Sequence, residues 1–125
     1  MKKIIISCIF SLSMIGCFAQ NANNAKVKTP EQRADHLTNW MTKAANLSND
    51  QKTKVYAVNL KYAQTNQATK SADQNNRKQM WQDLKANENE REAELKGIMT
   101  TEQFQAYSIA KQQLVEKRRE RKGRK

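Results

Sequence analysis

The sequence predicts an all-α protein, built from elongated antiparallel helical hairpins with about four helices. At three places a hydroxyl residue is followed three positions later by glutamine, a capping box that begins a helix. Only three glycines and one proline occur in 125 residues, which is too few for folds with many tight turns. Between the caps, apolar residues recur at spacings of three and four, the period of one helix face.

The start of the chain has the layout of a signal peptide for export. An apolar run over residues 4–15 follows a basic start, and small residues precede a cleavage point after Ala19. This run is short for a membrane span. We therefore expect residues 1–19 to be removed and the mature protein to lie in the periplasm. A lipoprotein anchored through Cys17 is the alternative, because the four residues ending there resemble a lipobox with methionine in place of leucine.

Removal of this segment changes the composition on which function depends. Lys2 and Lys3 leave with it, so the formal net charge falls from +11 to +9. Cys8 and Cys17 leave too, which excludes a disulfide framework or a thiolate site in the remaining chain. Leu, Ile, Val and Phe supply only thirteen of the remaining residues, a proportion typical of chains without a large core. We expect helices that share a thin apolar seam, which a second chain could complete.

Two capping boxes define the first half of the mature chain. Thr29 and Gln32 form the first box and predict a helix from about residue 30 to residue 45. Ser48 and Gln51 form the second box and begin a second helix. Apolar residues follow both caps at helical spacing: Leu37, Met41, Ala44, Val55, Val58 and Tyr62.

The middle of the chain is polar. Alanine is the only apolar residue type from position 63 to position 79, so this segment is either a solvated helix extension or a flexible connection. Ser, Asp and Asn within residues 71–76 predict a turn there. A third helix should then run from about residue 76 to residue 96. The seam of this helix consists of Met80, Trp81, Leu84, Glu88, Arg91 and Leu95. Its middle residues, Glu88 and Arg91, are charged where a buried helix would be apolar.

The end of the third helix and the fourth helix follow from local signals. Glu92 and Lys96 have the spacing of an ion pair on one helix, and Gly97 is expected to end the helix in a left-handed conformation. Thr100 and Gln103 form the third capping box. After this cap, one side of the fourth helix carries Phe104, Tyr107, Ala110 and Leu114.

The mature chain thus divides into three parts. Residues 20–28 are expected to be a flexible N-terminal segment, and residues 29–116 a helical domain. Residues 117–125 form a basic C-terminal tail with seven bases in nine positions, which we expect to fray.

The residues for catalysis or metal binding are sparse. His36 is the only histidine, whereas metal sites need several converging donors, so we expect neither a metal nor a cofactor. Glutamates at positions 88, 90, 92 and 94 alternate with other residues and face different directions on a helix, which indicates a solvated charged face. No Ser/His/Asp set or glycine-rich loop occurs in the sequence. We expect no enzymatic activity.

Charge and exposed apolar groups point to binding. A basic protein attracts nucleic acid, anionic lipid or acidic proteins. Because an exported protein rarely meets nucleic acid, we do not expect nucleic acid as the partner. The basic tail could contact an anionic surface, or simply keep the protein soluble. Trp40, Met80, Trp81 and Met99 are large for so small a core. They either form the core or line an exposed groove for partner chains.

Three segments share a pattern that ends in glutamine: Leu47-Ser48-Asn49-Asp50-Gln51, Met99-Thr100-Thr101-Glu102-Gln103 and Lys28-Thr29-Pro30-Glu31-Gln32. The first two resemble the paired LTxxQ motifs of the small periplasmic Spy/CpxP-like proteins, and the third resembles an upstream element of that family. The resemblance implies a cradle-like homodimer that acts as an ATP-independent chaperone or as a regulator of envelope-stress signalling. It also implies that the motif residues fix the helix starts. Met99 departs from the usual leucine, and the zinc-binding branch does not transfer to a chain with His36 alone.

We therefore expect a periplasmic chaperone-like protein that binds unfolded envelope proteins under stress. Met80, Trp81 and Leu84 are the predicted client contacts, following electrostatic capture by lysine and arginine. The alternatives are a regulatory partner of an envelope-stress sensor and a basic protein associated with a membrane or cell surface.

Overall fold

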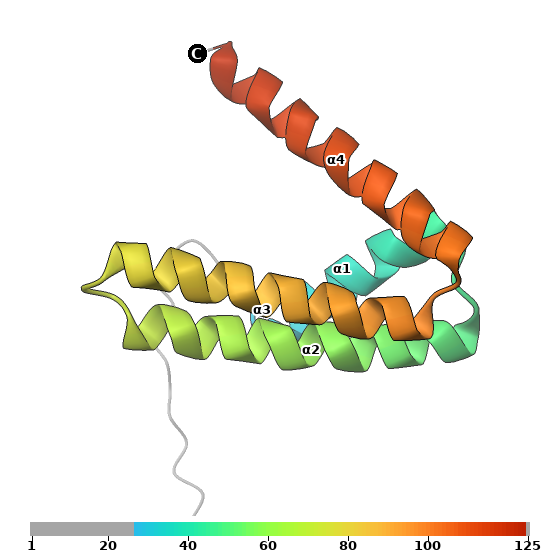
Figure 1. Ribbon diagram of the computed structural model, residues 1–125, viewed down its shortest axis with the longest axis horizontal. Helices are drawn as coiled ribbons and strands as arrows, with labels where there is room; N and C mark the ends of the chain where they lie inside the picture. Colours follow the sequence, from blue (N-terminus) through green and yellow to red (C-terminus); the bar gives the residue numbers. More distant parts are fainter. Residues whose placement is uncertain (1–26, 125) are drawn as a thin grey trace, which may run out of the picture.

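A computed structural model describes residues 27–124 of the protein, and the predicted signal peptide and Cys17 lie outside this range. The described residues form four helices and no strand, as the sequence predicts (Figure 1). The helices are α1 (Pro30–Ala45), α2 (Asn49–Ala72), α3 (Arg77–Ile98) and α4 (Thr101–Gly123). None of them is long and apolar enough to cross a membrane.

All three predicted capping boxes are present at the starts of α1, α2 and α4. At the start of α2, the backbone N–H of Gln51 donates to the Ser48 hydroxyl at 3.2 Å, and the Gln51 side chain accepts from the Ser48 N–H at 3.0 Å. Thr29 and Thr100 have the same roles with their own glutamines. Helix α3 begins with a simpler cap, in which the Gln79 N–H donates to the Asn76 side chain at 3.1 Å. Local hydrogen bonds therefore determine where all four helices begin.

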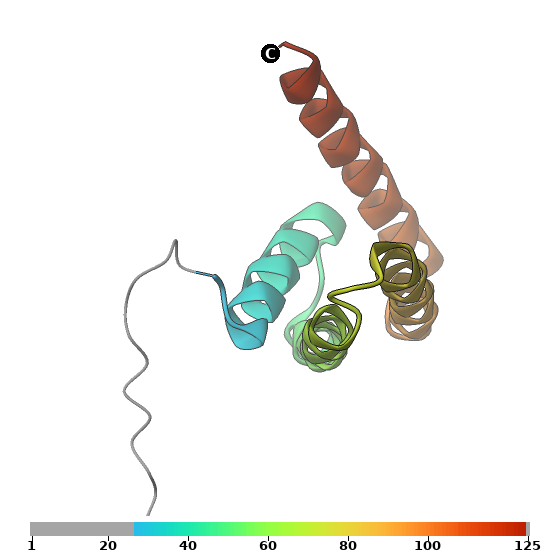
Figure 2. The same ribbon diagram turned by 90° about the vertical axis from the view of Figure 1, so that its left-hand side faces the viewer.

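Helices α2 and α3 form an antiparallel hairpin, and α1 and α4 are added to it. The polar segment after residue 63 continues α2 to Ala72, so the helical alternative is correct and the chain turns at residues 73–75. Seen along the hairpin, α1 lies beside α2, and α4 rises from the end of α3 (Figure 2). Asn46 ends α1 in the left-handed conformation (φ 51°), which turns the chain toward α2.

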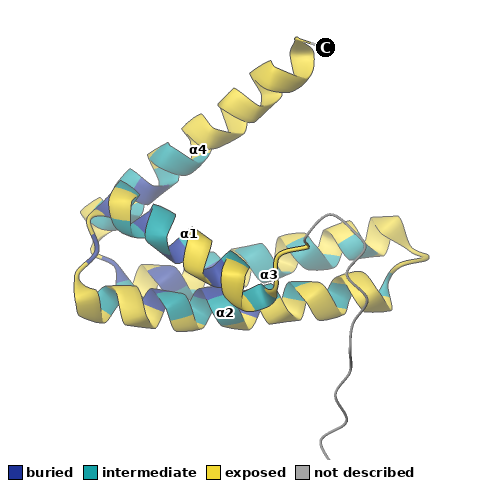
Figure 3. Ribbon diagram, turned by 180° about the vertical axis from the view of Figure 1, so that it is seen from behind, coloured by how far each residue is buried: buried dark blue, intermediate teal, exposed yellow. Residues whose placement is uncertain are grey.

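The core is small and lies where the α1–α2 and α3–α4 connections meet. Its buried residues are Met41, Ala45, Leu47, Val55, Leu95, Met99 and Tyr107. Partly buried Leu37, Trp40, Val58, Ile98 and Phe104 surround them. Every residue from Gln112 to Arg124 is exposed, so the outer part of α4 leaves the body of the protein (Figure 3).

Three local predictions are wrong. Gly97 lies inside α3, and the helix ends at Ile98. The next residue, Met99, has an extended backbone (ψ 154°) that leads directly into the Thr100 cap, and its side chain is buried. Glu92 pairs with Lys111 of α4 and not with Lys96. Residues 117–123 do not fray but continue α4, because the sequence there is rich in good helix formers and has bases near the helix C-terminus.

Candidate functional site

The two LTxxQ-like motifs contact each other at the junction of α2 and α4. The Gln51 amide donates to the Gln103 side-chain oxygen at 2.7 Å, and the Gln103 amide donates in return to the Gln51 oxygen at 3.0 Å. Gln51 also donates to the backbone carbonyl of Ile98, and Gln103 to that of Asn46. Each glutamine thus caps its own helix and ties it to the opposite connection.

This junction positions the start of α4. Leu47 and Met99, the first residues of the two motifs, are both buried in the core beside the glutamine pair. The motif residues therefore fix the helix starts and also join two segments about fifty residues apart in the sequence. They are structural in this arrangement, because the glutamine amides and the cap hydroxyls are already hydrogen-bonded within the chain.

A buried polar network joins all four helices behind the junction. Arg91 of α3 donates to the Asn59 side chain of α2 at 2.8 Å and to the Tyr107 hydroxyl of α4 at 2.9 Å. The Asn59 amide donates to Thr38 of α1 at 3.0 Å. Arg91 is only 5% exposed, and two donations to the Glu88 carboxylate balance its charge. The network fixes the direction in which α4 leaves the core.

Ion pairs continue this network toward the surface. Lys111 of α4 contacts Glu88 at 2.7 Å and also pairs with Glu92. Partial burial raises the pKa of Glu88, but hydrogen bonds from Arg91 and Lys111 outweigh it and hold that pKa below its ordinary value. The predicted solvated glutamate face is thus partly wrong, because Glu88 and Glu92 hold α3 to α4.

Another of these glutamates links α3 to α2. Glu94 accepts hydrogen bonds from Lys61 at 2.6 Å and from the Tyr62 hydroxyl at 2.7 Å. These two bonds lower the pKa of Glu94. Glu90 remains exposed, as the sequence predicts for the whole face.

A groove lies between α1 and α4 and has a volume of about 350 Å³; we call it the α1–α4 groove. Its apolar and aromatic lining residues are Leu37, Trp40, Tyr107, Leu114 and Val115. Leu114 and Val115 are 37% and 40% exposed, so the groove presents apolar surface to solvent. His36 and Arg118 also line it, and both are exposed.

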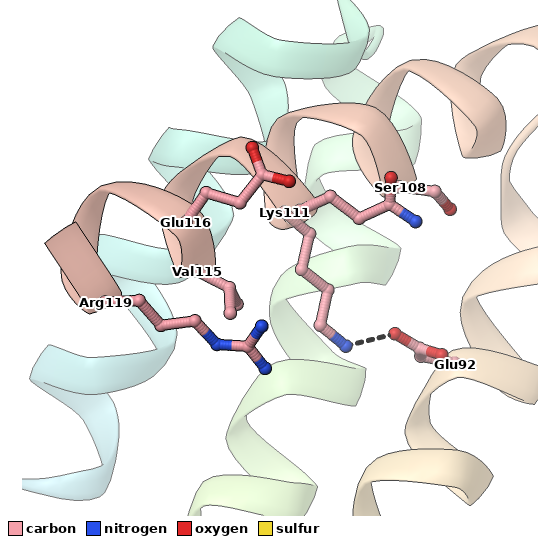
Figure 4. Close-up of a pocket in the computed structure, with 7 residues that line it drawn as sticks. Glu92, Ser108, Lys111, Val115, Glu116 and Arg119 are labelled. Carbon is pink, nitrogen blue, oxygen red and sulfur yellow. Dashed lines mark hydrogen bonds and ion pairs between the residues drawn. The ribbon is translucent and has the colours of Figure 1, made fainter.

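A second hollow adjoins this groove and lies between α4 and Glu92 of α3 (Figure 4). Val115 and Arg119 point toward the pair formed by Lys111 and Glu92, whereas Glu116 points away from it. Lys111 and Val115 line both hollows. The outer part of α4 therefore combines apolar and cationic groups on adjoining surfaces.

The predicted client-contact residues lie on the first turns of α3, far along the helix from the core residue Leu95. Trp81 is 62% exposed, the largest exposed aromatic group among the described residues, and Met80 and Leu84 beside it are partly buried. Trp40 and Met99, in contrast, belong to the core or pack against it. The alternatives for these large residues therefore divide: Met99 is in the core, Trp40 packs against the core and also lines the α1–α4 groove, Trp81 is exposed, and Met80 is partly buried outside the core.

Sequence reasoning missed the polar core and the α1–α4 groove. Thr38 and Asn59 are buried and hydrogen-bonded, but nothing local distinguishes them from surface residues of the same types. The spacing placed Tyr107 on the apolar side of α4, but it did not predict the hydrogen bond from Arg91. The signal available was Arg91 on the apolar seam of α3, since a buried arginine requires partners. Among residues 27–124, no group of three or more His, Cys, Asp and Glu side chains could hold a metal ion.

A protein-family model described as "Domain of unknown function (DUF4890)" matches residues 19–107. The matched region includes α1, α2, α3, the start of α4 and all three capping boxes. The outer part of α4 lies beyond it. Searches of curated proteins and of solved structures found no match.

Proposed function

We propose that this chain, which belongs to the DUF4890 family, is a periplasmic, ATP-independent chaperone-like protein that binds unfolded or partly folded envelope proteins. The observation that carries this proposal is the surface of α4. There the exposed apolar residues Leu114 and Val115 precede a run of bases on a helix that leaves the core (Figure 1). Exposed Trp81 on α3 adds a second apolar contact.

The physical logic is capture by charge followed by shallow apolar contact. A surplus of lysine and arginine accelerates encounter with acidic segments of a client. The small exposed apolar area then limits the lifetime of the complex, which leaves the client able to dissociate and fold. Binding of this kind needs no nucleotide.

The resemblance to Spy/CpxP-like proteins supports the same function through different residues. It rests on the motifs ending at Gln51 and Gln103, which join α2 to α4 in this chain. The proposal includes a homodimer and a response to envelope stress, because the same resemblance implies both.

An aggregation assay tests the proposed function. Residues 20–125 are mixed with a chemically unfolded client, and light scattering is followed without ATP at low and at high salt. We expect suppression at stoichiometric ratios that weakens as salt screens the bases. Full aggregation at low salt, with the protein in excess, would contradict the proposal.

Two variants locate the contact surface. Trp81→Ala should reduce protection if α3 contributes, and the double variant Leu114→Ser/Val115→Ser should reduce it if α4 does. Ile109→Ser is the matched control for the α4 pair, because Ile109 is 50% exposed but does not line the α1–α4 groove. If Trp81→Ala and the double variant both protect the client as well as the unchanged protein does, neither surface binds clients.

A second candidate function is regulation of one envelope-stress sensor. The observation that favours it is the α1–α4 groove, because a groove of defined shape suits a single partner. Crosslinking in cells separates the two: a chaperone captures many proteins, whereas a regulator captures one in saturable amounts. Association with a membrane or cell surface through residues 117–125 would instead be lost when that segment is deleted.

A further inference from the structure

We infer that the α1–α4 groove binds an acidic peptide segment of a partner protein, with an apolar side chain of the partner on Trp40, Leu114 and Val115 and a carboxylate at Arg118. Because this groove is one of the surfaces through which the protein would contact clients, the inference rests on the proposed function. It adds a site, an orientation and the chemistry of the bound segment.

The apolar part of the groove has rigid and exposed components. Trp40 packs edge-on against Tyr107, with ring centroids 5.9 Å apart, and Tyr107 is held by its hydrogen bond from Arg91. This side of the groove is therefore fixed before a ligand arrives. Leu114 and Val115, on the opposite side, are exposed. A partner side chain that covered them would remove apolar surface from water at little ordering cost to the protein.

The charge around the groove selects an acidic occupant. Arg118 lines the groove, and Lys117, Arg119, Arg121 and Lys122 follow or flank it on the same helix. The ion pairs of residues 27–124 use Lys61, Arg91 and Lys111, all of which precede this run. Glu116 and Glu120 are the only acidic residues in the outer part of α4. Glu88 is the one carboxylate among the residues that line the groove, and it is paired with Arg91 and Lys111, which also line it. A carboxylate on the partner would thus meet an excess of positive charge.

The same charge disfavours a second copy of α4 as the occupant. A second copy of α4 in the groove would bring its basic segment against the basic segment of the first copy. Like charges across an interface weaken binding. The apolar content disfavours a lipid surface. Leu114 and Val115 are the only two large apolar residues of the outer part of α4, and the polar residues Gln112 and Gln113 precede them. An acidic protein segment satisfies both the apolar and the cationic parts.

Trp40 provides a direct reporter of occupancy. In a Trp81→Phe background, Trp40 is the single tryptophan, so its fluorescence reports the groove alone. The probes are three synthetic peptides of equal length: one with leucine and glutamate, one with leucine and lysine, and one with serine and glutamate. We expect saturable 1:1 binding of the leucine–glutamate peptide, weakened by salt, and binding at least about tenfold weaker for the other two.

Matched variants assign the binding to the groove. Arg118→Glu should weaken binding of the leucine–glutamate peptide by about tenfold or more, whereas Lys117→Glu, outside the groove lining, should weaken it by less than about threefold. Leu114→Ser should abolish saturation, and Ile109→Ser should not. These side chains are exposed, and circular dichroism of each variant checks that the helices are retained.

Several results would overturn the inference. Equal affinity for the leucine–lysine peptide would show that the groove has no preference for acidic segments. Equal effects of Arg118→Glu and Lys117→Glu would show that the bases act only through the overall positive charge of the helix and not at the groove. Sedimentation that shows a dimer lost in Leu114→Ser would assign the groove to a second copy. Binding to phosphatidylglycerol vesicles that competes with the peptide would assign it to lipid. If the peptide fails to bind while aggregation is still suppressed, the inference fails and the proposed function stands.

Discussion

Replacement of Arg91 by methionine tests whether the buried polar network holds the four helices together. Arg91→Met keeps much of the side-chain volume but removes the donors to Asn59, Tyr107 and Glu88. The variant therefore changes hydrogen bonding far more than packing.

The expected loss follows from the groups left behind. Asn59 is 2% exposed and Tyr107 is 1% exposed, so each would keep an unsatisfied polar group away from water, at a cost of about 1–3 kcal/mol apiece. Glu88 contributes less, because its side chain is 36% exposed and it retains Lys111. Better burial of methionine offsets part of the sum. We expect the free energy of unfolding to fall by about 2–4 kcal/mol, a large share of the total for a small domain.

Urea unfolding followed by circular dichroism measures this loss. With the slope usual for small domains, the midpoint should fall by about 1–2 M. Tyr107→Phe, which removes one hydrogen bond of the network, should cost about 0.5–1.5 kcal/mol. Arg119→Met is the surface control and should change stability by less than about 0.5 kcal/mol. An Arg91→Met midpoint equal to that of Arg119→Met would refute the reasoning.

Three further predictions follow from the same contacts. In a double-mutant cycle, Gln51→Ala and Gln103→Ala should show a coupling energy of about 0.5–1.5 kcal/mol in urea unfolding; strict additivity would exclude the reciprocal amide pair. The folded-state pKa of Glu88 lies below its ordinary value, so its stabilisation is present above about pH 5 and is lost as pH falls through the folded pKa. Urea midpoints between pH 3 and pH 7 should therefore fall less steeply with acid in Glu88→Gln, and unchanged steepness would contradict this. Ser48→Ala should cost about 1 kcal/mol by removing the α2 cap, and no loss of thermal stability would argue against the capping box.

Local signals predicted the helices well because their causes are local. The start of α1 follows from Thr29 and Gln32, which contact each other across one helical turn. The turn after Ala72 follows from short polar residues. Gly97 misled because a glycine near a helix end usually adopts the left-handed conformation. In this chain α3 ends at Ile98 and Thr100 already caps the next helix, so Met99 is the only residue between them and its backbone must be extended.

The candidate site was less predictable because its contacts join distant segments. The interaction of Gln51 with Gln103 spans 52 residues, and that of Arg91 with Asn59 spans 32. A charged residue on the seam of α3 indicated that partners were needed but not which residues supply them. The predicted contact Trp81 is exposed, whereas the α1–α4 groove depends on the angle of α4, which no local pattern encodes.

Site-specific crosslinking in intact cells tests the central claim most directly. A photoreactive residue is placed at position 114, in the α1–α4 groove, and in a matched protein at position 109, outside it. The proposed function predicts that position 114 crosslinks many different envelope proteins, more of them when envelope proteins are unfolded by stress, and that position 109 crosslinks few. Equal crosslinking at the two positions, or capture of one protein alone at position 114, would contradict it.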